Sequence, residues 1–139
     1  MRFWDSSAIV PLLVRQSTSE KVDRWFAADG SVVAWTLTPV EVTSALWRLV
    51  RTNTIAEEDV YGVDARAAEF MAASHVIVDV EAVKSVAQRL LRVHQLRAAD
   101  ALQLGAALFW SDPRKSGATL HTLDERLAIA ARREGFEVP

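Results

Sequence analysis

Four acidic residues of the sequence lie where carboxylates can act together. Asp5 closes the β-type segment RFWD, and Asp124 directly follows a second β-type segment, ATLHTL. Glu41 lies in the first turn of the helix expected after SVVAWT, and Asp100 lies near the start of another expected helix. The carboxyl ends of strands in an open parallel sheet line the ligand crevice. Together, the four acids predict one acidic crevice.

Asp100 is the hardest of the four to explain by its neighbours. It occupies the stretch HQLRAADALQLGAALFW, where Ala99, Ala101 and Leu102 surround it and Arg97 is the one nearby cation. A charge without a partner is costly in an apolar environment, so proteins pair it, neutralise it or place a metal beside it.

Carboxylates brought together repel one another and need a counter-charge to stay ionised. A hard divalent cation such as Mg²⁺ or Mn²⁺ supplies that charge and accepts oxygen ligands. Such sites activate water and clamp a phosphodiester. Helix capping is the competing explanation, and for Glu41 or Asp124 taken singly it is the better one, since Asp124 fits an N-cap and Thr38–Glu41 matches a capping box.

Two other acid-based folds do not match these stretches. A receiver domain needs adjacent acids after its first strand, but FWDSSA offers Asp5 alone. A haloacid-dehalogenase-type phosphatase needs Asp-x-Asp at the same place, where Ser7 takes the second position.

Strand and helix patterns alternate along the whole chain. Strands are expected at residues 2–5, 31–36, 76–80, 118–123 and 136–138, and helices at 6–14, 17–29, 38–53, 56–73, 81–95, 94–110 and 124–135. This order predicts an α/β fold with a mainly parallel central sheet of about five short strands flanked by helices.

Several helix boundaries have recognisable signals. Ser17 and Glu20 have capping-box spacing, and Gly30 is expected to stop that helix. Thr38 is the expected N-cap of the next helix, with Pro39 as its first residue. Residues 112–117, DPRKSG, are expected to form a loop.

The composition indicates one compact domain spanning residues 1–139, because a chain of 139 residues that is 50% hydrophobic can bury a core. The absence of cysteine excludes thiolate zinc sites and cysteine nucleophiles, and fits a reducing cytoplasm. No signal peptide or bilayer-spanning stretch is evident. The net charge of −2 does not by itself predict nucleic-acid binding, but setting the four acids aside turns it into +2.

The motifs FWDSSAIVPLL, TPVEVTSALWRL, LRAADALQLGAAL and LHTLDERLAIAARREGF together resemble the PIN-domain nucleases, specifically the VapC-type toxins of toxin–antitoxin pairs. Each motif alone is weak, but four in this order over essentially the whole chain form a strong signal. The resemblance implies a PIN-like three-layer fold.

By this resemblance Asp5, Glu41, Asp100 and Asp124 match the metal-binding and catalytic acids of the family. Ser7 and Thr122 match its supporting small polar residues. The resemblance also implies Mg²⁺-dependent endoribonuclease activity (with Mn²⁺ as an alternative metal), a homodimer and a cognate VapB-type antitoxin. The target that the resemblance implies is a structured RNA such as tRNA. Two alternatives stay open: a binding module of the same fold that cleaves nothing, and a nuclease for DNA or structured nucleic-acid ends.

Other polar and aromatic residues give weaker signals. His75, His94 and His121 lack metal-ligand spacing, so structural or surface roles are expected, although His121 could flank the site. A phosphate-binding track and a plain solvated face are equally good explanations of the cations Arg89, Arg92, Arg97, Arg114 and Lys115. Core or interface positions are favoured over base stacking for Trp25, Phe26, Trp47, Phe109 and Trp110, and Leu46 with Trp47 is a candidate partner contact.

Overall fold

The computed structural model describes residues 1–139 and is built around a four-stranded parallel sheet with the order β3-β2-β1-β4. Its strands are β1 (Arg2–Trp4), β2 (Val32–Trp35), β3 (His75–Ile77) and β4 (Leu120–His121). Phe3 fixes the central register, because it pairs with Val33 on one side and with Leu120 on the other. The α/β class and the parallel sheet predicted from the sequence are confirmed.

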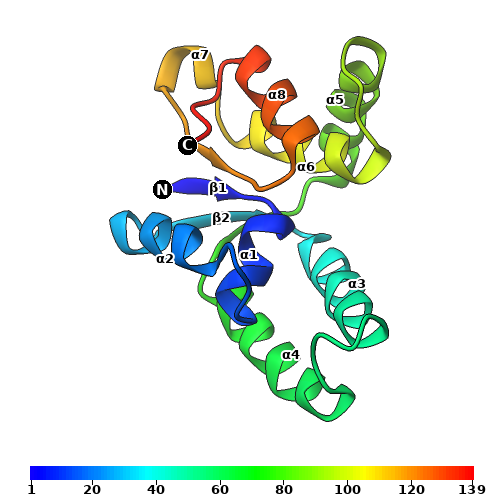
Figure 1. The fold of residues 1–139 in the computed structure, drawn as a ribbon. Helices are drawn as coiled ribbons and strands as arrows, with labels where there is room; N and C mark the ends of the chain where they lie inside the picture. The colour runs from blue at the N-terminus through cyan, green and yellow to red at the C-terminus, as the bar shows by residue number, and fades with distance from the viewer.

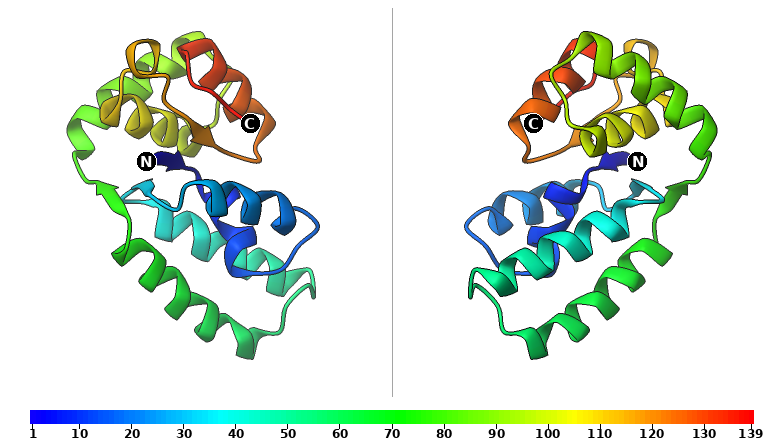
Figure 2. Two further views of the ribbon diagram at one scale, coloured as in Figure 1. Left: turned by 90° about the vertical axis from the view of Figure 1, so that its left-hand side faces the viewer. Right: turned by 90° about the vertical axis from the view of Figure 1, so that its right-hand side faces the viewer.

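Eight helices cover the two faces of this sheet in three layers (Figures 1 and 2). One face carries α1 (Ser6–Leu13), α2 (Ser19–Ala28), α3 (Thr38–Arg51) and α4 (Glu57–Ala72). The other face carries α5 (Val80–Val93), α6 (Ala98–Trp110), α7 (Pro113–Ser116) and α8 (Glu125–Glu134).

Two apolar cores follow from the alternation of side chains along each strand. Phe3, Val33 and Trp35 point into the core shared with α5, α6 and α8. Trp4 and Ala34 point into the core shared with α1, α2, α3 and α4. Because helices cover both faces of the sheet, the strands consist mainly of consecutive apolar residues, as is typical of buried parallel strands.

The order of the strands creates a topological switch point beside β1. The chain builds β1, β2 and β3 outward in one direction, and β4 then adds to the free side of β1. Ligands of open parallel sheets bind outside the carboxyl ends of the strands at such a point. The residues that follow β1 and β4 therefore face a shared crevice.

Two predicted segments differ from the structure. Residues 136–138 form no fifth strand, since Glu137 makes only an isolated bridge with Thr119. The expected loop 112–117 contains the one-turn helix α7, because Asp112 caps it by accepting a hydrogen bond from the backbone N–H of Arg114. Gly117 ends it with φ 61°, in the left-handed region.

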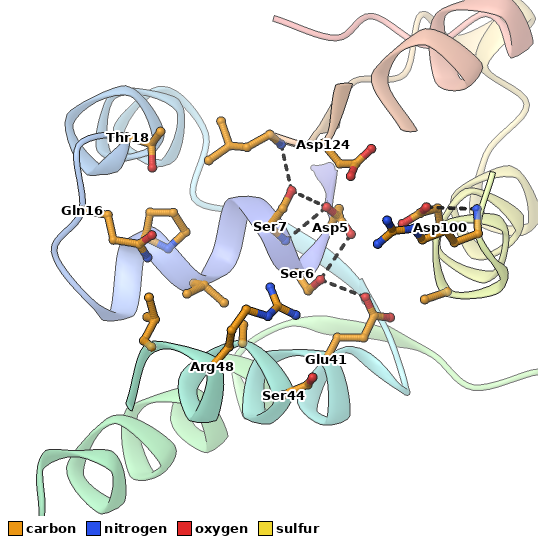
Figure 3. A pocket seen from close by; sticks show the side chains of 17 residues that line it. Asp5, Ser6, Ser7, Gln16, Thr18, Glu41, Ser44, Arg48, Asp100 and Asp124 are labelled. Atoms are coloured by element: carbon orange, nitrogen blue, oxygen red, sulfur yellow. Dashed lines mark hydrogen bonds between the residues drawn. The ribbon is translucent and has the colours of Figure 1, made fainter. Parts of the chain in front are cut away.

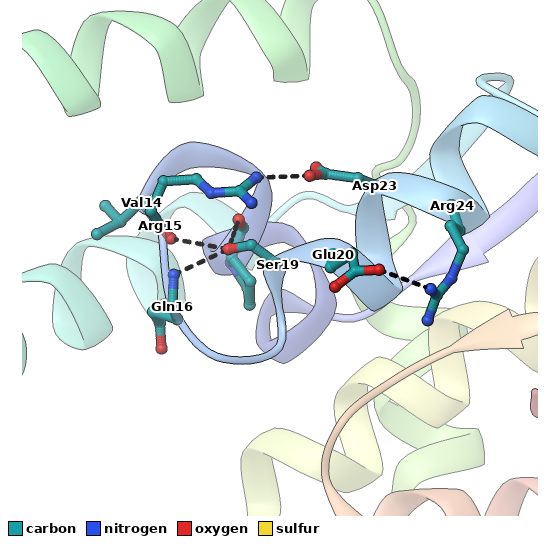
Figure 4. Close-up of polar contacts among 8 residues, drawn as sticks. Val14, Arg15, Gln16, Ser19, Glu20, Asp23 and Arg24 are labelled. Carbon is teal, nitrogen blue, oxygen red and sulfur yellow. Dashed lines mark hydrogen bonds and ion pairs between the residues drawn. The ribbon is translucent and has the colours of Figure 1, made fainter.

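The capping box predicted from Ser17 and Glu20 is wrong. α2 begins at Ser19, whose buried hydroxyl donates to the carbonyl oxygen of Pro11 and accepts from the N–H of Gln16, at 2.6 and 2.9 Å (Figure 4). Glu20 instead forms an exposed ion pair with Arg24. The start of α2 is thus fixed by a contact to α1 rather than by a local cap.

Gly105 lets α6 approach α5 closely. A Cβ atom at this position would lie 3.1 Å from the carbonyl oxygen of Val83 and 3.3 Å from the backbone nitrogen of Ala87. Both are backbone atoms of α5, so neither can move without shifting that helix. The position of α6 matters because its first turn carries Asp100.

We predict that Gly105→Ala lowers the free energy of unfolding by about 1–3 kcal/mol, because the added methyl group overpacks the α5–α6 contact. Gly62→Ala in the middle of α4 is the matched control, since a Cβ there meets no atom within 4 Å. That change should raise stability by up to about 1 kcal/mol through helix propensity. Urea unfolding of both variants tests the opposite signs, and stabilisation by Gly105→Ala would contradict the close packing.

Candidate active site

A cleft of about 530 Å³ opens at the switch point, and its lining includes Asp5, Glu41, Asp100 and Asp124 (Figure 3). The four acids come from the ends of β1 and β4 and from the first turns of α3 and α6. The structure therefore brings the four predicted site residues together. The structure also places beside them residues that the sequence analysis did not identify as part of the site.

Asp5 is the most buried of the four acids, with 3% of its surface exposed. One of its oxygens, Oδ2, accepts hydrogen bonds from the backbone N–H and the hydroxyl of Ser7 and, at 2.9 Å, from the hydroxyl of Thr122. The other oxygen, Oδ1, has only a 3.4 Å contact from the Ser6 hydroxyl. Asp5 thus keeps one oxygen available to the cleft.

Ser7 and Thr122 join the ends of β1 and β4. Each hydroxyl has one proton, and both protons are used on Asp5. Their own oxygens then accept from the backbone, Ser7 from the N–H of Leu123 at 2.8 Å and Thr122 from that of Asp124 at 3.0 Å. The two residues therefore hold Asp5 and the backbone before Asp124 in one network.

Asp124 and Asp100 also have helix-capping contacts. Asp124 caps α8 by accepting from the N–H of Leu127 at 2.9 Å. Asp100 is the hardest of the four acids to explain as a cap from the sequence, yet it accepts a hydrogen bond from the N–H of Arg97 at 3.2 Å. Each of these carboxylates uses one oxygen for its helix and has no protein donor on the other.

Glu41 is held by residues from two other helices. The Ser6 hydroxyl donates to its Oε2 at 2.9 Å, and the Gln103 amide donates to its Oε1 at 3.0 Å. The capping box predicted for Thr38 and Glu41 is therefore wrong. α3 begins one residue earlier than expected, and the buried Thr38 hydroxyl accepts from Gln103 instead of capping the helix.

Three of the four acids, Asp5, Glu41 and Asp100, have a raised pKa. Burial raises the pKa of Glu41 to about 7, and the charges of Asp5 and Asp100 add to this shift. Burial also raises the pKa of Asp5, with the charge of Asp100 as a further cause. The pKa of Asp100 is raised by burial and by the charge of Asp124. These mutual effects indicate a common concentration of negative charge.

No protein cation neutralises this charge by direct contact. None of the four acids has a Lys or Arg nitrogen within 4.0 Å. The uncommitted oxygens of Asp5, Asp100 and Asp124 are hard donors of the kind that Mg²⁺ and Mn²⁺ accept. This donor set fits such a cation, although no three acidic or histidine side chains already have the spacing of a formed metal site.

The histidines contribute no ligand to the cleft. His121 is fully buried against Trp4 and Trp25, and both of its ring nitrogens lack a hydrogen-bond partner. Burial, aided by the charge of Arg2, lowers its pKa to about 4, so the ring is neutral at pH 7. His94 hydrogen-bonds to Glu134, and His75 lies exposed on β3.

The cations around the cleft are not the predicted set. Of that set only Arg97 lines the cleft. Arg89 is paired with Glu134, and Lys115 is paired with Asp112. Arg48, which was not among the predicted cations, lines the cleft from α3 (Figure 3). Its spacing of seven residues from Glu41, two helical turns on one face, is the signal that could have identified it.

Two further expectations concern apolar side chains. Leu46 is completely buried in the core beneath the sheet, so it is not available to a partner. Trp47, its neighbour on α3, is partly exposed. Trp25 is partly buried and packs against His121 and Trp4 at the edge of the core, whereas Phe26 and Phe109 are 38% and 46% exposed.

Known proteins share this sequence and architecture. A family model described as PIN domain matches residues 2–133. Two proteins from strains of Mycobacterium tuberculosis, ribonuclease VapC45 and ribonuclease VapC49, are each 30% identical over 137 residues, covering 98% of this chain and 92% of theirs.

Solved structures share the fold at lower identity. A toxin–antitoxin complex from Klebsiella pneumoniae contains a chain that aligns with a TM-score of 0.65 and 14% identity, covering 92% of this chain and 91% of that one. PAE2754 from Pyrobaculum aerophilum aligns with a TM-score of 0.62 and 22% identity, covering 99% and 87%.

The sheet order and the acidic cleft define a three-layer α/β protein with its site at the topological switch point. The match over residues 2–133 assigns the family, and the chain belongs to the PIN domain family. None of its helices is both long and apolar enough to cross a bilayer.

The raised pKa of Glu41 predicts a specific pH dependence of stability in EDTA. Protonation of a group whose pKa is about 7 in the fold and ordinarily 4.5 favours the folded state below about pH 4.5, and this advantage is lost as the pH rises through 7. Glu41→Gln has no such charge. Its stability relative to wild type should therefore grow between pH 4.5 and pH 7.

Urea unfolding of the two proteins at several pH values measures this difference. Glu69→Gln, at an exposed position on α4, is the control and should give a constant difference across the range. A constant difference for Glu41→Gln as well would mean that neighbouring carboxylates and burial do not shift the titration of Glu41.

Proposed function

We propose that this protein is a Mg²⁺-dependent endoribonuclease, with Mn²⁺ as an alternative metal, and that it is the toxin of a toxin–antitoxin pair. The observation that carries this proposal is the convergence of four carboxylates on one cleft where no Lys or Arg side chain forms an ion pair with any of them. Family membership and the ribonuclease names of its relatives support the same class of reaction.

The proposed roles follow from the oxygens that each acid leaves uncommitted. Asp5 and Asp100 are the proposed principal ligands. Each has one oxygen engaged by backbone or hydroxyl donors and the other without a close protein donor, a feature that Asp124 shares. Glu41 and Asp124 complete the site or orient the attacking water. When bound, the cation would polarise the phosphate and favour ionisation of water at neutral pH. Ser7 and Thr122 keep Asp5 oriented.

Arg48 and Arg97 are the proposed contacts for the RNA backbone. They line the cleft, and neither is engaged in an ion pair with a carboxylate. Guanidinium groups beside an acidic centre can hold the phosphates of a strand whose scissile bond lies at the carboxylates. By the family resemblance, the substrate would be a structured RNA such as tRNA.

The proposed partners are a VapB-type antitoxin and a second copy of the chain. A free endoribonuclease in the cytoplasm is harmful, so a protein that occupies the cleft is expected. The similar chain from Klebsiella pneumoniae belongs to a toxin–antitoxin complex, which supports a partner of this kind. Leu37 and Val40, 40% and 67% exposed at the start of α3, provide apolar surface on the helix that carries Glu41.

The proposed function predicts that purified protein cleaves structured RNA with Mg²⁺ or Mn²⁺ and that EDTA abolishes cleavage. Asp5→Asn should lower the rate more than about 100-fold, because even residues that only support metal ligands cost 10–100-fold. Matched DNA in the same assay separates the ribonuclease from a DNA nuclease. Cleavage that persists in EDTA would disprove the mechanism, and no cleavage of either nucleic acid would favour a binding module.

The proposed function also predicts how Asp100→Asn changes stability and its response to Mg²⁺. If Asp100 is a ligand, the variant in EDTA should be at least as stable as wild type, because the amide removes carboxylate repulsion. Wild type should gain about 2.7 kcal/mol at a Mg²⁺ concentration 100 times Kd, and the variant should lose most of this gain. Melting curves across a Mg²⁺ titration measure both quantities.

Asp59→Asn is the matched control, because Asp59 lies in the first turn of α4 just as Asp100 lies in that of α6. It should lose about 0.3–1 kcal/mol with or without metal, as a carboxylate that interacts only with a helix dipole does. An equal Mg²⁺ response in wild type and Asp100→Asn would leave Asp100 with a capping role alone.

A further inference from the structure

Gln103 is a buried polar residue in α6, a helix made mostly of apolar residues. It is fully buried on α6 between Leu102 and Leu104, one turn after Asp100. Its Oε1 atom has no hydrogen-bond partner and no access to solvent. A buried acceptor without a donor is costly, and an apolar side chain at this position would avoid that cost. The amide therefore needs an explanation beyond packing.

The hydrogen bonds of the Gln103 amide nitrogen explain why a polar side chain is present here. Nε2 donates to Glu41 Oε1 at 3.0 Å and to Thr38 Oγ1 at 3.2 Å, two residues one turn apart on α3. The opposite orientation of the amide would set Oε1 against the carboxylate, where two acceptors repel each other. Glu41 thus fixes which way the amide points, and Thr38 anchors it.

Ser6 completes the hold on Glu41 from α1, because its hydroxyl donates to Oε2 at 2.9 Å (Figure 3). Neutral donors therefore occupy both oxygens of the carboxylate, from two helices on opposite sides of the sheet. A glutamate side chain has several rotatable bonds, so without these donors its carboxylate would be free to turn away from Asp5 and Asp100.

We infer that Gln103 is a positioning residue, which holds the Glu41 carboxylate toward the metal-binding centre. This inference rests on the proposed function for its consequence, namely tighter binding of the divalent cation and faster cleavage. Gln103 need not touch the metal or the RNA, since it acts through Glu41. It would also couple two acids mechanically, because Asp100 and Gln103 share one face of α6.

The test is a double-mutant cycle between Gln103→Met and Glu41→Ala, with Mn²⁺ affinity measured by titration calorimetry. Methionine keeps the length and volume of the side chain but lacks the donor. In the wild-type background Gln103→Met should weaken Mn²⁺ binding about 10–100-fold, the usual cost of losing a group that orients a ligand. In the Glu41→Ala background it should change the affinity by less than about twofold.

Cleavage assays and two controls complete the design. Gln103→Met should lower kcat for RNA cleavage and leave KM unchanged, while Gln88→Met, the same change at an exposed position of α5, should alter neither. Unfolding in EDTA checks that the variants fold.

Two results would overturn the inference: wild-type Mn²⁺ affinity in folded Gln103→Met, or an equal loss in both backgrounds. If wild type neither binds Mn²⁺ nor cleaves RNA, the proposed function fails by itself. The positioning role is then decided by a crystal structure of Gln103→Met, in which a displaced Glu41 side chain supports it and an unchanged one refutes it.

Discussion

Mutual repulsion among four carboxylates in a partly buried cleft is the constraint on which the rest of this structure depends. Burial raises the pKa of Asp5, Glu41 and Asp100, and the charge of at least one neighbouring acid adds to each of these shifts. The fold places each acid at the start of a helix: Asp5 and Asp124 cap α1 and α8, while Glu41 and Asp100 lie in the first turns of α3 and α6. Four positive helix ends therefore converge on the cleft and favour negative charge.

Neutral hydrogen-bond donors hold the carboxylates in place, in addition to the effect of the helix ends. Asp5 receives three donors on one oxygen, and the Ser7 and Thr122 hydroxyls also bind the backbone that leads to Asp124. Hydroxyl and amide donors hold a carboxylate without cancelling its charge, whereas an arginine at the same place would form an ion pair. The site is thus ordered yet remains negative, which is the state that a divalent cation requires.

The fold and the four acids could be predicted because both follow from local patterns. Alternating β-type and helical segments define a parallel sheet, and acids directly after strands must lie at its carboxyl edge. The errors arise where a distant contact overrides a local signal. α2 begins at Ser19 rather than after Ser17, because the Ser19 hydroxyl donates to the Pro11 carbonyl oxygen. Glu41 forms no capping box, because its carboxylate accepts hydrogen bonds from Ser6 and Gln103 instead. Residues 136–138 have strand-like composition but make only one bridge.

Gln103 marks the limit of sequence-based reasoning at this site. Its position three residues after Asp100 on a helix could have been noted, but its target on α3 depends on how two helices meet across the edge of the sheet. α6 is also packed closely against the α5 backbone, where Gly105 leaves room by having no Cβ atom. The position of α6 matters to the site because this helix carries both Asp100 and Gln103. The arrangement of the cleft therefore depends on the packing of α6 as well as on the four acids.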